Sequence, residues 1–163
     1  MNHYVFGNTS SGARGLGRRI VRAEDLNWLA WMRNDPSTWT HLTDPSPVTT
    51  ADQEAWFASL RGGKRLYLIA EEPSAVNRSA SVGLVRMDEI DHINKNIRVG
   101  LDVHLELRGK GLGTRVYKEL ILPYCFDALN MHRVWLQVLE DNPAERLYTR
   151  LGFKSEGRLR EAV

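Results

Sequence analysis

Cysteine, net charge and long apolar runs are all scarce in this sequence of 163 residues. Cys125 is the one cysteine, so no disulfide can form within the chain, and we expect it to be an inert core thiol. The formal net charge is only +2, which gives no electrostatic reason to expect nucleic acid or a membrane as partner. No apolar run could span a membrane and no leader sequence opens the chain, so we expect a cytoplasmic protein.

The stretch that organises the rest of the sequence runs from residue 97 to residue 153. It opens on alternating apolar and polar residues over 97–104, which is the pattern of a half-buried strand. A glycine-rich turn follows, with the sequence Leu107-Arg108-Gly109-Lys110-Gly111-Leu112-Gly113-Thr114. Beyond the turn, a spacing of four predicts one face of a helix, made of Leu112, Val116, Leu120, Tyr124 and Ala128. The segment is therefore predicted to fold as strand, turn and helix.

The glycine-rich turn is suited to binding an anion. The first turn of a helix has N–H groups without an intrahelical partner and carries a partial positive charge. Glycines remove the side chains that would keep a phosphate away from those groups. Arg108 and Lys110 add formal positive charge. We predict that this turn binds a phosphate or pyrophosphate.

The spacing of the glycines excludes two common phosphate loops. A mononucleotide P-loop needs a lysine between its last glycine and the Ser or Thr, whereas Thr114 follows Gly113 directly. A dinucleotide fingerprint needs Gly-x-Gly-x-x-Gly, whereas these glycines fall at 109, 111 and 113. The pattern that fits is Arg-x-x-Gly-x-Gly, which resembles the pyrophosphate loop of the GCN5-related N-acetyltransferases, a family that binds acetyl-coenzyme A (acetyl-CoA).

A second motif, about thirty residues further on, supports the same resemblance. Residues 133–139 alternate as another strand. Asn142 and Pro143 then suit the start of a short helix, and Gly152 suits its end. The run Asn-x-x-Ala, Leu-Tyr and Leu-Gly-Phe, which ends at Phe153, is similar to the closing motif of the family. With the strand before them, the two motifs cover residues 81–160.

The resemblance implies an α/β fold with one mixed, mostly antiparallel sheet of about six to seven strands and helices on both faces. It implies a single acyl-CoA N-acyltransferase domain over 1–163, with an N-terminal extension (1–17), an acceptor-side half (18–80) and an acetyl-CoA-binding half (81–163). Thr50 and Gln53 have the spacing of a capping box that opens a second helix. Further strands are predicted at 18–22, 66–70 and 81–88, and another that begins at Phe153.

The family normally has a seventh strand after the one that begins at Phe153, and the sequence ends at Val163. An unfilled pair of strand edges favours pairing with another segment. Two candidates for that place stay open: the extension around residues 4–6, and a partner subunit in a homodimer.

The resemblance also implies the activity, which is direct transfer of an acetyl group from acetyl-CoA to an amine without a metal. The pantetheine arm would pair with the backbone of the strand at Leu101 and Val103, and the diphosphate would rest on the glycine-rich turn. The cofactor-binding residues implied in this way are Leu101, Val103, Arg108, Gly109, Lys110, Gly111, Leu112, Gly113, Thr114, Asn142 and Arg146. Asn142 either bonds the pantetheine arm, caps its helix, or does both.

Tyr148 matches the family's tyrosine that returns a proton to the leaving thiolate, and its ordinary pKa of about 10 is close to that of a thiol. The alternative is a core tyrosine with a locally bonded hydroxyl. Glu140 and Asp102 are candidates for the general base, and His41 and His104 are further alternatives.

The acceptor amine stays open. The whole-chain pattern is similar to the branch of ribosomal-protein N-terminal and nucleotide-amino-sugar acetyltransferases, through Trp31-Met32-Arg33-Asn34-Asp35 and Trp56-Phe57. A protein N-terminal amine, a nucleotide-linked amino sugar and another small amine are all candidates. Trp39 and His41 are predicted to line the acceptor pocket. A catalytically silent acetyl-CoA-binding module is the alternative outside enzymes, although the presence of both Tyr148 and Asn142 argues against it.

Overall fold

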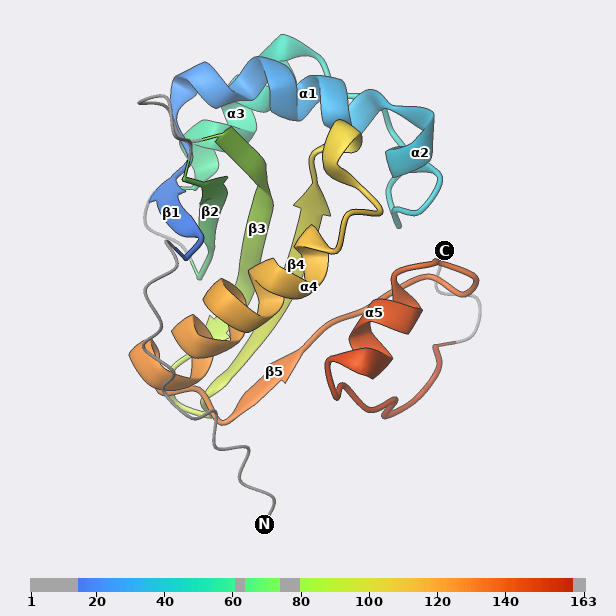
Figure 1. The fold of residues 1–163 in the computed structure, drawn as a ribbon. Helices are drawn as coiled ribbons and strands as arrows, with labels where there is room; N and C mark the ends of the chain where they lie inside the picture. The colour runs from blue at the N-terminus through green and yellow to red at the C-terminus, as the bar shows by residue number, and fades with distance from the viewer. Residues whose placement is uncertain (1–14, 61–63, 74–79, 160–163) are drawn as a thin grey trace.

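The computed structural model describes residues 15–60, 64–73 and 80–159, and its centre is an open sheet in the order β1-β2-β3-β4-β5 (Figure 1). Neighbouring strands are antiparallel except β4 and β5, which are parallel. The strands are β1 (Gly17–Ile20), β2 (Leu66–Glu72), β3 (Ala80–Asp91), β4 (Asn96–Val103) and β5 (Arg133–Trp135). The α/β class with a mostly antiparallel sheet is confirmed.

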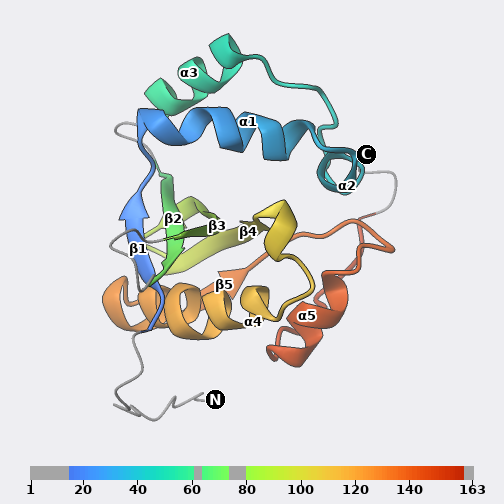
Figure 2. The ribbon, with the colours of Figure 1, turned by 45° about the horizontal axis from the view of Figure 1, so that its top comes forward.

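Helices cover both faces of the sheet. Figure 2 shows α1 and α3 over one face and α4 over the other. The helices are α1 (Leu26–Asn34), α2 (Pro36–Trp39), α3 (Thr50–Ser59), α4 (Leu112–Val116) and α5 (Glu145–Arg150), with short 3₁₀ turns η1 (Ala23–Asp25) and η2 (Leu105–Leu107). Because successive strand residues point to opposite faces, β3 sends Leu84 toward α1 and sends Val85 and Met87 toward α4. Among the described residues, no helix is long and apolar enough to cross a membrane.

Among the described residues five strands form instead of six or seven, so the strand count was predicted too high. β5 stops at Trp135, although the alternating pattern continues to residue 139, because its pairing with β4 ends at Arg98–Trp135. A strand needs a partner for its backbone groups, and pattern alone supplies none. Residues 153–159 likewise form no strand, so that prediction was wrong. Residues 4–6 lie outside the described part of the chain.

The helix that opens at α4 is longer than its first segment. It continues through π-helical turns at η3 (Tyr117–Ile121) and η4 (Tyr124–Ala128), on either side of Pro123. Pro123 has no N–H to donate, and the wider turns carry the helix past it. The predicted buried face holds at Leu112, Val116 and Leu120, but Ala128 is exposed. Ala128 lies in the π-helical turn η4, whose wider turns do not keep the predicted spacing on one face, so the last member leaves the core.

Two helix starts lie one or two residues from their predicted places. The capping box of α3 is formed by Thr49 and Asp52, not by Thr50 and Gln53: Thr49 Oγ1 accepts from the Asp52 N–H at 3.2 Å, and Asp52 accepts from the Thr49 N–H at 2.8 Å. Helix α5 begins at Glu145, because residues 143 and 144 form a turn before it. Its predicted end at Gly152 is confirmed, with φ +92° and a bond from the Phe153 N–H to the Tyr148 carbonyl at 3.0 Å.

Asp25 ties the first strand to the first helix. Its carboxylate is 2% exposed and accepts from Arg19 at 2.6 and 2.8 Å, from the Arg22 N–H at 2.8 Å and from Trp28 Nε1 at 3.3 Å. Burial acts to raise the pKa of Asp25, but these hydrogen bonds and the Arg19 charge outweigh it and lower the pKa below the ordinary value. The ionised carboxylate is therefore part of the fold.

Asp25→Asn is expected to lower the free energy of unfolding by about 2–3 kcal/mol at pH 7, because Arg19 loses its buried anionic partner. Because the folded-state pKa lies below the unfolded one, this contribution is present above about pH 4 and is lost as the pH falls through the folded-state value. Urea denaturation at pH 7 and pH 3 measures both effects. Glu24→Gln, in the same turn but exposed, is the control and should cost little. An equal loss in the two variants would contradict the prediction.

Candidate active site

The glycine-rich turn presents bare backbone to open space. Gly109 and Gly111 have φ of +75° and +76°, the left-handed region that glycine adopts without strain. A Cβ built on either residue would meet no atom of the described chain within 4 Å. The first backbone bond of α4 runs from the Arg115 N–H to the Gly111 carbonyl at 3.3 Å, so the N–H groups just before Arg115 are the unpaired ones of a helix start. The turn therefore fits a diphosphate, which would take the space that side chains leave free.

A third glycine lets two helices approach each other. A Cβ on Gly113 would lie 3.2 Å from Leu147 Cδ2, so a larger residue here would require the Leu147 side chain on α5 to shift. The next residue on α5 is Tyr148. The glycine pattern thus leaves the turn free of side chains and also lets α5, which carries Tyr148, lie close to α4.

Arg108 is directed away from the turn. Its Nε donates to the Val103 carbonyl at 3.1 Å, its Nη1 to Ser37 Oγ at 2.9 Å and its Nη2 to Thr38 Oγ1 at 2.7 Å. All three guanidinium nitrogens are engaged between the end of β4 and the first turn of α2. Lys110 remains exposed on the turn itself.

The backbone of β4 faces a gap where β5 has diverged, as Figure 1 shows. Pairing between the two strands ends at Arg98, and β4 continues to Val103. The His104 N–H donates to Val82 on β3 at 2.8 Å. Since backbone groups alternate along a strand, those of Leu101 and Val103 point the other way, toward the gap. These are the two residues whose backbone was predicted to bind pantetheine.

Tyr148 packs in an aromatic cluster between α4 and α5. Its ring lies 5.8 Å from that of Tyr117 and 5.9 Å from that of Phe153, both in edge-on geometry. Burial raises the pKa of Tyr148; the Tyr117 hydroxyl and the Arg86 charge act against that shift, and the Asp102 charge adds to it. Tyr148 is thus a protonated phenol at neutral pH, within electrostatic reach of Asp102 near the end of β4.

The family described as "Acetyltransferase (GNAT) domain" matches residues 16–154. This chain belongs to the GNAT acetyltransferase family. The spermidine N(1)-acetyltransferase of Escherichia coli is 38% identical over 78 residues, which are 47% of this chain and 41% of that protein. The chain thus matches less than half the length of this relative.

Two further proteins match nearly the whole GNAT domain. YdaF of Bacillus subtilis, named as a proposed ribosomal N-acetyltransferase, is 26% identical over 93% of this chain and 77% of that protein. The Vibrio cholerae spermidine N-acetyltransferase in complex with CoA and spermine has a TM-score of 0.77 and 25% identity, covering 90% of this chain and 85% of that one. Acetyl-CoA is the co-substrate of GNAT enzymes, and the glycine-rich turn fits its diphosphate.

Asp102, a candidate base of this GNAT domain, is held by an arginine that the sequence analysis missed. Arg86 Nε lies 3.0 Å from Asp102 Oδ2, and its Nη2 donates to Oδ1 at 3.2 Å. Gly100 makes room for the pair, because a Cβ there would lie 2.9 Å from Arg86 Nη2. The pairing of Arg86 with Gly100 across β3 and β4 is a matter of strand register. The sequence could have indicated this pair if the register of the hairpin formed by β3 and β4 had been worked out, because that register brings Arg86 close to Asp102.

The other candidate residues of the acetyl-CoA-binding half are more exposed. Glu140 is exposed and forms an ion pair with Arg158. No hydrogen bond or ion pair in the described part of the chain joins it to Asp102 or Tyr148. Asn142 caps the turn before α5, where its Oδ1 accepts from the Ala144 N–H at 2.9 Å. Arg146 is exposed on α5.

The acceptor-side candidates lie around α2. Trp39 lines a cavity of about 270 Å³ together with Asn34, Pro45 and Pro47. His41 is exposed, and its Nδ1 lies 3.1 Å from Thr40 Oγ1. The structure therefore joins Trp39 to a cavity but leaves His41 on the surface.

His104 was named only as an alternative base, and it sits under α1. Its ring lies 5.8 Å from Trp28 and 5.6 Å from Trp31. Its Nδ1 is buried and makes no hydrogen bond among the described residues. The contacts of its ring with two tryptophans of α1 favour a packing role for His104.

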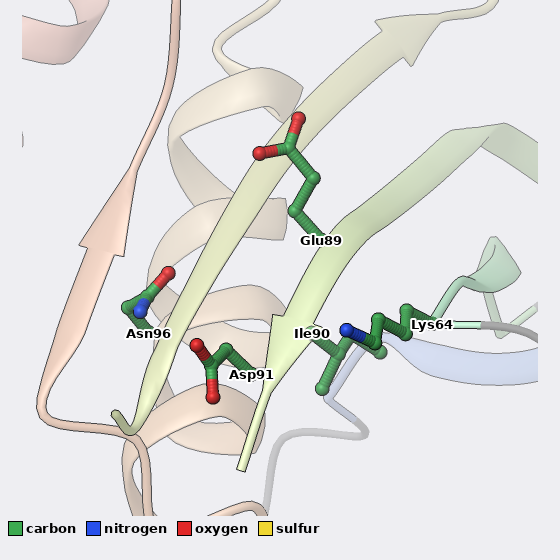
Figure 3. Close-up of a pocket in the computed structure, with 5 residues that line it drawn as sticks. All are labelled: Lys64, Glu89, Ile90, Asp91 and Asn96. Carbon is green, nitrogen blue, oxygen red and sulfur yellow. The ribbon is translucent and has the colours of Figure 1, made fainter. Parts of the chain in front are cut away.

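A second cavity lies at the opposite end of β4 from the glycine-rich turn. Its volume is about 260 Å³, and its lining residues are Lys64, Glu89, Ile90, Asp91 and Asn96 (Figure 3). Asp91 is engaged in the turn, where it accepts from the N–H groups of Ile93 and Asn94 at 2.9 Å. Figure 3 shows the Glu89 carboxylate lying away from Asp91 and Asn96. The side chains do not converge on one point, so the cavity is not part of the site.

Tyr117 is the other residue missed from the sequence. It is 0% exposed, and its hydroxyl makes no hydrogen bond of standard geometry within the described residues. Burial, and then the neighbouring Tyr148, raise the pKa of Tyr117 well above its ordinary value. The sequence did contain a signal for Tyr117, since it is a tyrosine among aliphatic residues on the predicted buried face of the helix. Cys125, by contrast, is buried as expected, and burial raises the pKa of its thiol to about 12.

Proposed function

We propose that this GNAT domain is an acetyl-CoA-dependent N-acetyltransferase whose acceptor is a small primary amine. The observation that carries the transfer is the pair of left-handed glycines at the start of α4, beside a strand whose backbone faces a gap. When bound, acetyl-CoA supplies an acetyl thioester. The turn would hold its diphosphate on backbone N–H groups, and Leu101 and Val103 would bond the pantetheine arm.

Tyr148 is proposed as the general acid that protonates the leaving sulfur. Its burial keeps the phenol protonated at neutral pH, which an acid requires. Asp102 is proposed to accept the proton from the attacking amine, since it lies on β4 beside the expected position of the acetyl group. Its carboxylate is anchored by Arg86, whereas Glu140 is exposed and paired with Arg158. We therefore prefer Asp102 over Glu140 for that role.

The small-amine acceptor is supported by the relatives and by the cavity at Trp39. The E. coli and V. cholerae relatives are spermidine N-acetyltransferases. Trp31 and Trp39 expose part of their rings on the acceptor side, and aromatic faces attract ammonium groups. A protein N-terminal amine is the second candidate, favoured by the similarity to YdaF over 93% of this chain.

Thiol release from acetyl-CoA separates these candidates. The purified protein is expected to release CoA several times faster with spermidine than without an acceptor, and to yield monoacetylated spermidine by mass spectrometry. A peptide with a free N-terminus, the same peptide with a blocked N-terminus and a nucleotide-linked amino sugar are compared at equal concentration. Faster turnover of the free peptide would favour the second candidate. Release that no amine accelerates would contradict both.

A further inference from the structure

We infer that Arg108 is a positioning residue for the acceptor side, which fixes α2 against the end of β4, and not a ligand of the diphosphate. The inference goes beyond the proposed function, and its kinetic test rests on that function. It assigns a different role to a residue that the sequence motif places in the phosphate loop.

The contacts of Arg108 join parts of the chain that are far apart in sequence. On one side its Nε donates to the Val103 carbonyl at 3.1 Å. On the other side Nη1 donates to the Ser37 carbonyl at 3.1 Å and to Ser37 Oγ at 2.9 Å, and Nη2 donates to Thr38 Oγ1 at 2.7 Å. A guanidinium is a planar fork whose donors act together, so these bonds fix one orientation of α2 relative to β4.

Helix α2 needs such an external anchor. It has four residues, Pro36–Trp39, and a single helical turn is not stable by itself. Asp35 caps it from within, accepting from the Ser37 N–H at 2.8 Å. Within α2, Thr38 is buried, and the next residue, Trp39, lines the acceptor-side cavity. A shift of α2 would therefore move a wall of that cavity.

The same bonds make Arg108 a poor phosphate ligand. To reach an anion on the turn, its guanidinium would have to leave four oxygen acceptors on Val103, Ser37 and Thr38. Lys110 is exposed on the turn and makes no hydrogen bond or ion pair among the described residues. The formal positive charge near the diphosphate therefore comes from Lys110. Arg108 instead links the strand that faces the pantetheine gap to the helix that shapes the acceptor side.

The test compares Arg108→Gln, the near-isosteric Thr38→Val and the double variant. Thr38→Val removes one charge-assisted contact to α2 and is expected to raise the KM for the accelerating amine by about fivefold. Arg108→Gln removes all of the guanidinium contacts to α2 and should raise that KM by at least as much. The dissociation constant for CoA, measured by calorimetry, should stay within about twofold. The double variant should be no worse than Arg108→Gln alone, since both changes remove one shared interaction. Lys110→Gln is the matched control and should weaken CoA binding while leaving the acceptor KM unchanged.

A second measurement does not need turnover. Hydrogen exchange at the amides of Ser37, Thr38 and Trp39 should quicken in Arg108→Gln and in Thr38→Val, because α2 loses its anchor. Faster exchange in a protein that acetylates no amine would leave the positioning role standing and contradict only the proposed function. Unchanged exchange would overturn the positioning role. So would an Arg108→Gln variant that binds CoA tenfold more weakly while Thr38→Val changes neither constant, because Arg108 would then be a phosphate ligand.

Discussion

Tyr148→Phe is expected to lower kcat about 100-fold or more while the dissociation constant for acetyl-CoA stays nearly the same. A positioned general acid contributes about 10²- to 10⁴-fold, and phenylalanine keeps the ring that packs against Tyr117 and Phe153. Because burial raises the pKa of Tyr148, the alkaline limb of the wild-type kcat profile should lie above the ordinary tyrosine value of about 10. That limb should disappear in the variant.

Tyr124→Phe is the matched control for this experiment. Tyr124 is another half-buried tyrosine, on the long helix that opens at α4, and its ring packs against Arg18. Removal of the Tyr124 hydroxyl should leave kcat within about twofold of the wild-type value. Wild-type turnover in Tyr148→Phe would remove the phenol from the mechanism. An equal fall in both variants would mean that the loss is one of folding, which the melting temperature would show.

Gly111→Ala is expected to weaken acetyl-CoA binding by about tenfold or more. At φ +76° an alanine costs about 1–2 kcal/mol of backbone strain, and its methyl group would occupy the open space where the diphosphate has to approach. The affected quantity is the dissociation constant of CoA, measured by calorimetry. The affinity for pantetheine, which lacks the diphosphate, should fall much less in this variant.

Gly157→Ala controls for the loss of a glycine as such. Gly157 also has open space around a built Cβ, but its φ is outside the left-handed region. This variant should bind CoA like the wild type. If Gly111→Ala also binds CoA like the wild type, the turn is not the diphosphate site, whatever its backbone conformation.

The parts of the fold that could be predicted from sequence are those set by short-range pattern. Alternation placed β2, β3 and β4 within a few residues, and Gly152 ended α5 as its left-handed conformation requires. The predictions were wrong where contact with another residue or strand determines where an element begins or ends. Residues 136–139 alternate like a strand, yet β5 ends at Trp135 because β4 has moved out of reach. Thr49 caps α3 instead of Thr50, because the side chain of Asp52, three residues later, also accepts a hydrogen bond from the Thr49 N–H.

The candidate site divides in the same way. Gly109 and Gly111 were singled out from the first motif and Tyr148 from the second, and the structure gives the two glycines the left-handed backbone of an open turn. Arg108 looked like a phosphate ligand because its charge lies next to the turn in sequence. Its side chain instead reaches α2, seventy residues away, where Ser37 and Thr38 offer acceptors.

The sequence by itself determined the open glycine-rich turn, since glycine conformation and helix-start N–H groups are local properties of the chain. Only the tertiary structure decided which charged side chains stay exposed beside that turn and which bond other segments. Arg86 meets Asp102 through strand register, Tyr117 meets Tyr148 through helix packing, and Arg108 meets Thr38 across the two halves. The physical reason is that a long side chain bonds whatever acceptor folding brings within about 3 Å, and sequence distance places no limit on that choice.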